Sequence, residues 1–98
     1  MKLMTKEIQK KFESKPLGST EMLGDNAEIV VKFFTPWANW TWYATEFDGE
    51  DLFFGLVDGF EKELGYFSLA ELESVSGPFG LKIERDLHFG NKTLADVK

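Results

Sequence analysis

Cysteine is absent from this 98-residue chain, histidine occurs once and proline three times. Without cysteine, the chain can form neither disulfides nor thiolate metal sites. No apolar run approaches the roughly 18 residues that a membrane span needs. The N-terminal stretch MKLMTKEIQKKF also lacks the long apolar core of a signal peptide. We therefore expect a cytoplasmic protein with no membrane partner, no cofactor and no metal site.

Basic residues are in the minority, since 11 Lys and Arg face 17 Asp and Glu and the net charge is -6. Nonspecific nucleic-acid binding depends on Lys and Arg at phosphates, so this balance disfavours nucleic acid as a partner. Most of the acids between residues 46 and 63 fall in two turns at opposite ends of one predicted strand. They form no continuous stripe, which disfavours mimicry of DNA and favours ordinary solubility charge.

Aromatic residues are abundant, at 15% of the chain, and they concentrate in segments with strand signals. Four such segments follow one another closely: Glu28–Phe34, Trp40–Phe47, Leu52–Val57 and Glu63–Ser68. Two of the links between them contain Asp-Gly, which tolerates the positive φ angles of tight hairpins. These features predict a four-stranded antiparallel meander.

Helix signals flank the predicted meander. Thr5 can cap a short helix that ends near Ser14, before the Lys15-Pro16 pair. Ser68 and Glu71 form a capping-box pattern that opens a second short helix.

A fifth strand and a tail complete the chain. Apolar and polar residues alternate from Ile83 to Phe89, which predicts a fifth strand at a sheet edge. Residues 91–98 are expected to form a frayed tail. The predicted fold is a single α+β domain over residues 1–98, with an antiparallel four- to five-stranded meander sheet and two short helices.

The strand pattern predicts two apolar sheet faces, with Trp40 and Trp42 on one face and Tyr43 and Phe47 on the other. A two-residue turn at Asp48-Gly49 places Trp42 opposite Gly55, whereas a three-residue turn places Tyr43 there. The first register also pairs Glu46 with Asp51, a like-charge contact, and this favours the second. In either register a bulky ring covers the strand glycine.

Two short helices offer too little surface to cover both apolar faces. We therefore expect an exposed aromatic patch, and such patches tend to be interfaces. The candidate partner-binding residues are Trp37, Trp40, Trp42 and Tyr43. Trp37 lies in the predicted loop between the first two strands. The alternative is that Trp40 and Trp42 belong to the core. A homodimer would also cover an apolar sheet face that the helices leave exposed.

The single histidine, His88, is the main candidate for chemistry. Asp86 and Glu84 precede it at two-residue spacing, so all three share one side of a strand. A histidine beside carboxylates can act as a general base, which makes a small ligand-binding or enzymatic domain an alternative function. No second histidine completes a usual metal site, and no catalytic nucleophile stands out.

Two further hypotheses are a calcium site and a surface that binds single-stranded nucleic acid. The acidic turn Asp48–Asp51 lacks the ligand pattern of a calcium loop and is expected to be a solvated hairpin turn. Single-stranded nucleic acid could stack on the tryptophans, but Lys32 is the only base among residues 28–57.

Several ordered motifs resemble a small uncharacterised bacterial family, a domain of unknown function. They are NWTWY at 39–43, LFFGLV at 52–57, ELGYFSL at 63–69 with AELESV at 70–75, and IERDLHF at 83–89. The opening MKLMTKEIQKKF and VVKFFTP at 30–36 also fit. The resemblance covers nearly the whole chain and implies a setting on plasmids, integrative elements and phages. It carries over no catalytic residues.

Together these features predict a non-catalytic accessory protein of a mobile genetic element that acts by protein–protein binding. Its partner would be a host or element-encoded protein, and its role anti-defence or regulatory.

Overall fold

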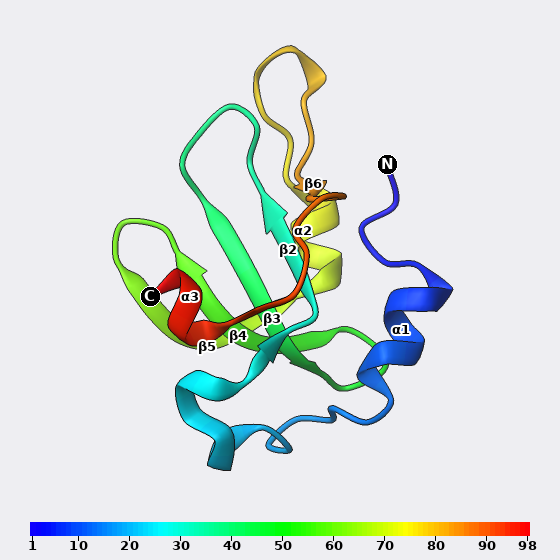
Figure 1. Ribbon diagram of the computed structural model, residues 1–98. Helices are drawn as coiled ribbons and strands as arrows, with labels where there is room; N and C mark the ends of the chain where they lie inside the picture. The colour runs from blue at the N-terminus through cyan, green and yellow to red at the C-terminus, as the bar shows by residue number, and fades with distance from the viewer.

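The main sheet contains five antiparallel strands in the order β5-β4-β3-β2-β6, with short helices around it (Figure 1). The computed structural model describes residues 1–98. The strands of this sheet are β2 (Val31–Phe34), β3 (Thr41–Phe47), β4 (Leu52–Asp58), β5 (Lys62–Ser68) and β6 (Glu84–Arg85). The predicted α+β class and antiparallel meander are confirmed. The fifth strand lies at the edge beside β2, and it is only two residues long.

A second, two-stranded sheet pairs β1 with β7. The remaining elements are α1 (Lys6–Phe12), η1 (Glu21–Asn26), β1 (Glu28–Ile29), α2 (Leu69–Ser74), η2 (Pro78–Gly80), β7 (Lys92–Thr93) and α3 (Leu94–Val97). Both predicted helices are present. The hydroxyl of Thr5 accepts a hydrogen bond from the Ile8 amide at the start of α1, and that of Ser68 accepts one from the Glu71 amide at the start of α2.

Both predicted registers are wrong because the link between β3 and β4 is longer than predicted: Phe47 pairs with Phe53, which leaves residues 48–52 between them. A β-bulge at Thr45 then shifts the register by one residue. Ala44 pairs with Gly55 and Glu46 pairs with Phe54, so Thr45 is an extra residue in β3. No ring covers Gly55. Instead, a Cβ at Gly55 would overlap the carbonyl oxygen of Tyr43, so the backbone of β3 itself fills the space.

The bulge also moves Phe47 to the face opposite the predicted one. Phe47 stacks on Phe53 with ring centroids 4.5 Å apart, on the same face as Trp42. Tyr43 stays on the other face, opposite Leu56.

The acidic turn between β3 and β4 has a structural role. Asp48 accepts hydrogen bonds at Oδ1 from the amides of Glu50, Asp51 and Leu52, and these bonds lower the pKa of its carboxyl. Asp51 reaches α2, where its carbonyl accepts from the Leu69 amide and its Oδ1 from the Ala70 amide. The turn therefore caps the helix that follows β5.

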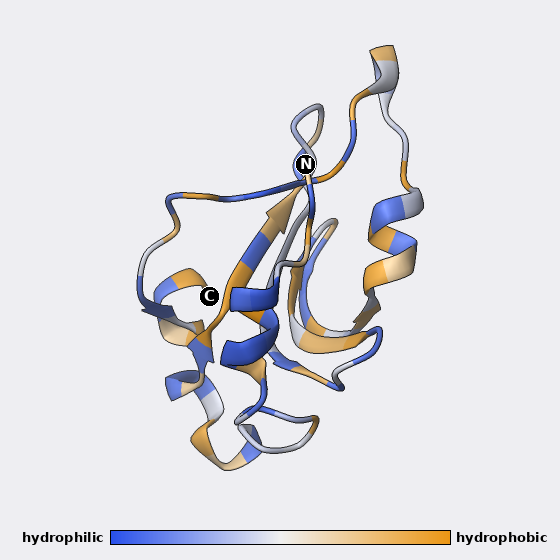
Figure 2. Cartoon of the chain, turned by 90° about the vertical axis from the view of Figure 1, so that its right-hand side faces the viewer, coloured by the Kyte–Doolittle hydropathy of each residue, from blue (hydrophilic) through white to orange (hydrophobic).

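The larger core lies between the sheet and the layer formed by the N-terminal segment, α1 and α2. Its buried residues are Leu3, Phe12, Val31, Phe33, Ala44, Phe47, Phe53, Phe67, Leu72 and Ile83. Phe53 lies at its centre, with the rings of Phe12, Phe33 and Phe67 all within 6 Å between centroids. Figure 2 shows α1 as an almost wholly hydrophilic ribbon, consistent with the lysines that cover its outer side.

The opposite sheet face has a smaller core of Ala27, Ile29, Leu56 and Leu94. The prediction that residues 91–98 fray is wrong. Lys92 and Thr93 pair with β1, the carboxylate of Asp96 accepts hydrogen bonds from the Thr93 amide and hydroxyl, and Leu94 is buried. Burial of Leu94 against this face stabilises the segment, because it removes the side chain from water.

Glu46 is a buried carboxylate that fixes the loop before η1. Its Oε1 accepts from the Gly18 amide at 2.7 Å, and its Oε2 accepts from the Thr20 amide at 2.8 Å and from the Thr20 hydroxyl at 2.5 Å. Burial on its own raises the pKa of Glu46, but these three hydrogen bonds outweigh it. The pKa therefore lies below the ordinary value of 4.5.

Candidate functional site

The four predicted partner-binding aromatics do not form one surface. Trp37 lies in the loop between β2 and β3 and is half-buried. Its ring packs flat over Gly77, where a Cβ would overlap it, and it contacts the larger core. It therefore ties this loop to the hairpin-like loop of residues 75–82, which projects from the sheet in yellow to orange (Figure 1).

Trp40 and Trp42 lie next to each other at one end of the sheet. Their rings stack with centroids 6.0 Å apart. Trp40 covers Gly59 in the turn between β4 and β5, where a Cβ would overlap its ring. The predicted ring over the strand glycine Gly55 is therefore wrong, and the glycine that Trp40 covers lies outside the strands.

Phe60 completes this aromatic row, although sequence reasoning missed it. It meets Trp40 edge to face, with centroids 5.3 Å apart and an interplanar angle of 81°. Its side chain is 94% exposed, far more than the half-buried tryptophans. The available signal was a large apolar residue directly after Asp58-Gly59, in a turn where polar residues are the norm.

A hollow of about 400 Å³ lies beside this row. We call it the Trp40 hollow, and its lining residues are Trp40, Val57, Phe60, Glu61 and Glu63. Val57 and Glu63 pair across β4 and β5 and so point to the same sheet face. The hollow thus combines two aromatic rings with two exposed carboxylates.

Tyr43 belongs to a different environment on the opposite face. Its ring lies 5.9 Å from that of Phe89, and the Lys32 ammonium lies 6.0 Å from the Tyr43 ring centroid. Burial raises the pKa of the Tyr43 hydroxyl, and the negative charges of Asp58 and Asp86 raise it further. The structure therefore separates Tyr43 from the three tryptophans.

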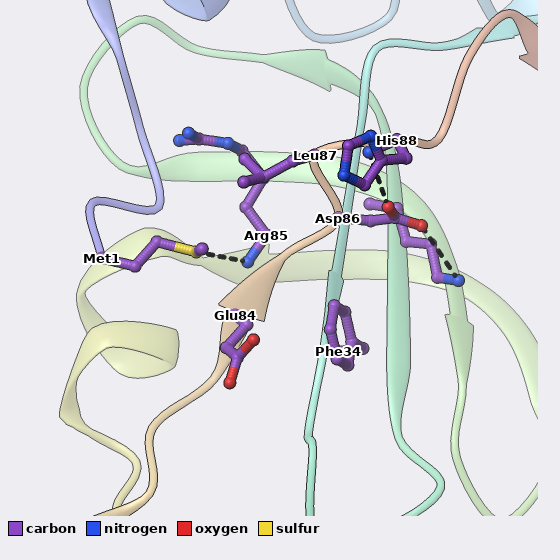
Figure 3. A pocket seen from close by; sticks show the side chains of 8 residues that line it. Met1, Phe34, Glu84, Arg85, Asp86, Leu87 and His88 are labelled. Carbon is purple, nitrogen blue, oxygen red and sulfur yellow. Dashed lines mark hydrogen bonds and ion pairs between the residues drawn. The ribbon is translucent and has the colours of Figure 1, made fainter.

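Glu84, Asp86 and His88 do line one hollow, of about 320 Å³ (Figure 3). We call this the His88 hollow; its wall also includes Met1, Lys32, Phe34, Arg85 and Leu87. Asp86 pairs with the Lys32 ammonium at 3.5 Å, and its Oδ1 accepts from the backbone amide of His88 at 2.9 Å. The imidazole itself forms no hydrogen bond to either carboxylate.

The predicted strand from Ile83 to Phe89 is much shorter in the structure. β6 ends at Arg85, and the Asp86 hydrogen bond to the His88 amide forms a turn in place of further sheet pairing. The Asp86 carboxylate serves Lys32 and this turn, so it does not orient the imidazole as a general-base partner would. The residues are close together, but the arrangement of an acid–base pair is not formed.

The chain has neither a metal-binding cluster of side chains nor a helix that could span a membrane. No group of three or more His, Cys, Asp or Glu side chains is arranged to hold a metal ion. None of the helices has both the length and the apolar character needed to cross a membrane.

Comparison with known proteins gives one finding. A family described as "Protein of unknown function (DUF2958)" matches residues 3–96, which is nearly the whole chain. No curated protein and no solved structure matches.

Proposed function

Because the chain belongs to the DUF2958 family of proteins of unknown function, we propose its function from its surface: it is a non-catalytic protein that binds another protein through the Trp40 hollow and Phe60. The observation that carries this proposal is the exposure of Phe60. Its ring is 94% exposed and rests against the edge-to-face partner Trp40.

The aromatic row gives this exposed ring a firm support. Trp40 packs on Gly59 and stacks on Trp42, which contacts the larger core. Side chains held in place before binding lose less conformational entropy when a partner arrives. Large aromatic side chains backed by packed neighbours are typical of binding hot spots.

We place the protein in the cytoplasm as an accessory of a mobile genetic element, with an anti-defence or regulatory role. The mobile-element setting and its anti-defence or regulatory role rest on the motif resemblance described above. The partner is a host or element-encoded protein, and a second copy of the chain is the alternative that would be detected as a dimer in solution.

Replacing Phe60 with alanine is expected to abolish partner capture without unfolding the protein, because the side chain is almost fully exposed. The measurement is affinity capture from host lysate with quantitative mass spectrometry, comparing wild type with Phe60→Ala. Phe79→Ala is the matched control, since Phe79 is equally exposed but lies in the projecting loop, outside the Trp40 hollow. Equal capture of the same proteins by wild type and Phe60→Ala would contradict the proposal.

A second candidate function uses the His88 hollow, because the structure brings Glu84, Asp86 and His88 to its wall. A small ligand bound there would contact the exposed imidazole. If this function holds, ligand-dependent shifts in the nuclear magnetic resonance spectrum will centre on residues 84–88 when a library of small metabolites is screened. His88→Ala should remove these shifts, and a screen that leaves these signals unmoved removes the candidate.

Stacking of single-stranded nucleic acid on the tryptophans gains no support from the geometry. The aromatic row is flanked by Glu61 and Glu63, whose carboxylates repel phosphates.

A further inference from the structure

We infer that the Trp40 hollow receives an arginine side chain from a basic segment of the partner protein. The inference rests on the proposed function and specifies the chemistry of the partner. It follows from the residues that line the hollow and from the absence of a basic residue among them.

The hollow has an apolar interior and an acidic rim. Val57 lies on the sheet face, and the rings of Trp40 and Phe60 meet beside it. Glu61 and Glu63 are exposed, and neither forms an ion pair within the chain. The intervening Lys62 forms no ion pair with them, and its ammonium donates at 3.0 Å to the carbonyl of Val97, a residue that packs against the smaller core on the opposite face.

The lysines of helix α1 lie far from the Trp40 hollow. Helix α1 packs through Phe12 on Phe47 and Phe53, at the opposite end of β3 and β4. Phe53 is four residues from Val57 along β4, or about 13 Å. No lysine or arginine of the chain therefore pairs with these two carboxylates, and a basic partner would complement their charge.

On the opposite sheet face, a lysine of the chain already occupies a site made of aromatic rings and a carboxylate. The Lys32 ammonium lies within about 6 Å of three ring centroids, those of Phe34, Tyr43 and Phe89. Its charge partner is Asp86. There the combination of aromatic rings and a carboxylate already holds a cation. In the Trp40 hollow, rings and carboxylates are present and the cation is missing.

Arginine suits this site better than lysine. Its planar guanidinium can lie against an aromatic ring while its edge donates two parallel hydrogen bonds to a carboxylate. Lysine offers a compact, strongly hydrated ammonium that forms no such paired contact. An open hollow with both ring and carboxylate surfaces therefore selects the guanidinium.

The test uses three capped heptapeptides that differ only at the central residue, with glycine and serine around it. That residue is arginine, lysine or citrulline, the neutral isostere of arginine. Binding is followed through the indole N–H signal of Trp40, assigned with Trp40→Phe. We expect an arginine-peptide dissociation constant on the order of 1 mM, weaker binding of the lysine peptide, and no response to the citrulline peptide.

Variants tie the binding to the hollow. Phe60→Ala should weaken binding of the arginine peptide about fivefold, the amount expected for loss of one exposed cation–aromatic contact. Glu61→Gln with Glu63→Gln should reduce the preference for arginine over citrulline to the part that the aromatic rings supply. The matched control, Glu71→Gln with Glu73→Gln on α2, makes the same charge change at the same spacing and should bind like wild type.

The outcomes separate this inference from the proposed function. Equal binding of the arginine and citrulline peptides, or equal losses in the Glu61/Glu63 and Glu71/Glu73 variants, would overturn the inference. If protein capture still depends on Phe60 in that case, the proposed function stands and its partner is not basic. If capture is also independent of Phe60, both fail.

Discussion

Replacing Gly55 with alanine is expected to destabilise the protein by about 3 kcal/mol or more. An added Cβ would overlap the Tyr43 carbonyl oxygen and would lie 2.8 Å from its carbonyl carbon. Both atoms belong to the backbone of the neighbouring central strand, so a side-chain rotation cannot relieve the overlap. The sheet would have to open at the β3–β4 pairing next to the bulge.

Gly65→Ala is the matched control for this substitution. Gly65 pairs directly with Gly55 across β4 and β5, yet a Cβ there meets nothing within 4 Å. Its stability should stay within about 1 kcal/mol of wild type. Urea unfolding measured by tryptophan fluorescence compares the two variants. Similar midpoints for both would show that the close approach of Tyr43 to Gly55 does not constrain the sheet.

Glu46→Gln is expected to destabilise the fold by about 3 kcal/mol at neutral pH. The buried carboxylate accepts from two amides and one hydroxyl, and an amide side chain can supply only one oxygen for them. Its NH₂ group would face a backbone donor, leaving both unsatisfied in a buried position. The loop of residues 18–20 should detach from β3 as a result.

The effect should depend on pH in a defined direction. The folded pKa of Glu46 is below its ordinary value of 4.5, so the charged form stabilises the fold. This contribution is present in full above the unfolded pKa, and it is lost as the pH falls through the folded pKa. The stability difference between wild type and Glu46→Gln should therefore be constant near neutrality and shrink as the pH falls below the ordinary value of 4.5.

Denaturant unfolding at a series of pH values measures this difference. Glu73→Gln serves as a control because Glu73 is exposed on α2 and forms no hydrogen bond through its side chain. It should follow wild type throughout. A gap between wild type and Glu46→Gln that widens with acid would contradict the assignment of Glu46 as a charged acceptor.

Local signals explain why most elements were predictable. Thr5 and Ser68 act as helix caps through contacts within three residues, and a sequence shows such contacts directly. The four strand segments are rich in β-branched and aromatic residues, and two of the links between them contain Asp-Gly. These patterns predicted the order β2 to β5 without knowledge of distant contacts.

Features that depend on distant contacts were not predictable in the same way. Leu94 is buried because it packs on Ile29 of β1 and on Leu56. Without these distant contacts, the sequence of residues 91–98 predicts only a tail. Glu46 looks like one of several acids near a turn, and only the loop at Gly18 and Thr20 shows its role. At the candidate site, Trp40 was found from composition, whereas Phe60 required the geometry of the turn.

The bulge at Thr45 has a consequence for comparing sequences within the family. An alternating pattern keeps its phase along a regular strand, but here the phase changes once, between Ala44 and Glu46. An alignment gap placed beside this position would exchange the two sides of the strand from Glu46 onward. It would assign a carboxylate to the phenylalanine-rich interior and a core ring to the outer side. Alignments of these proteins should therefore treat the residue at this position as a fixed insertion.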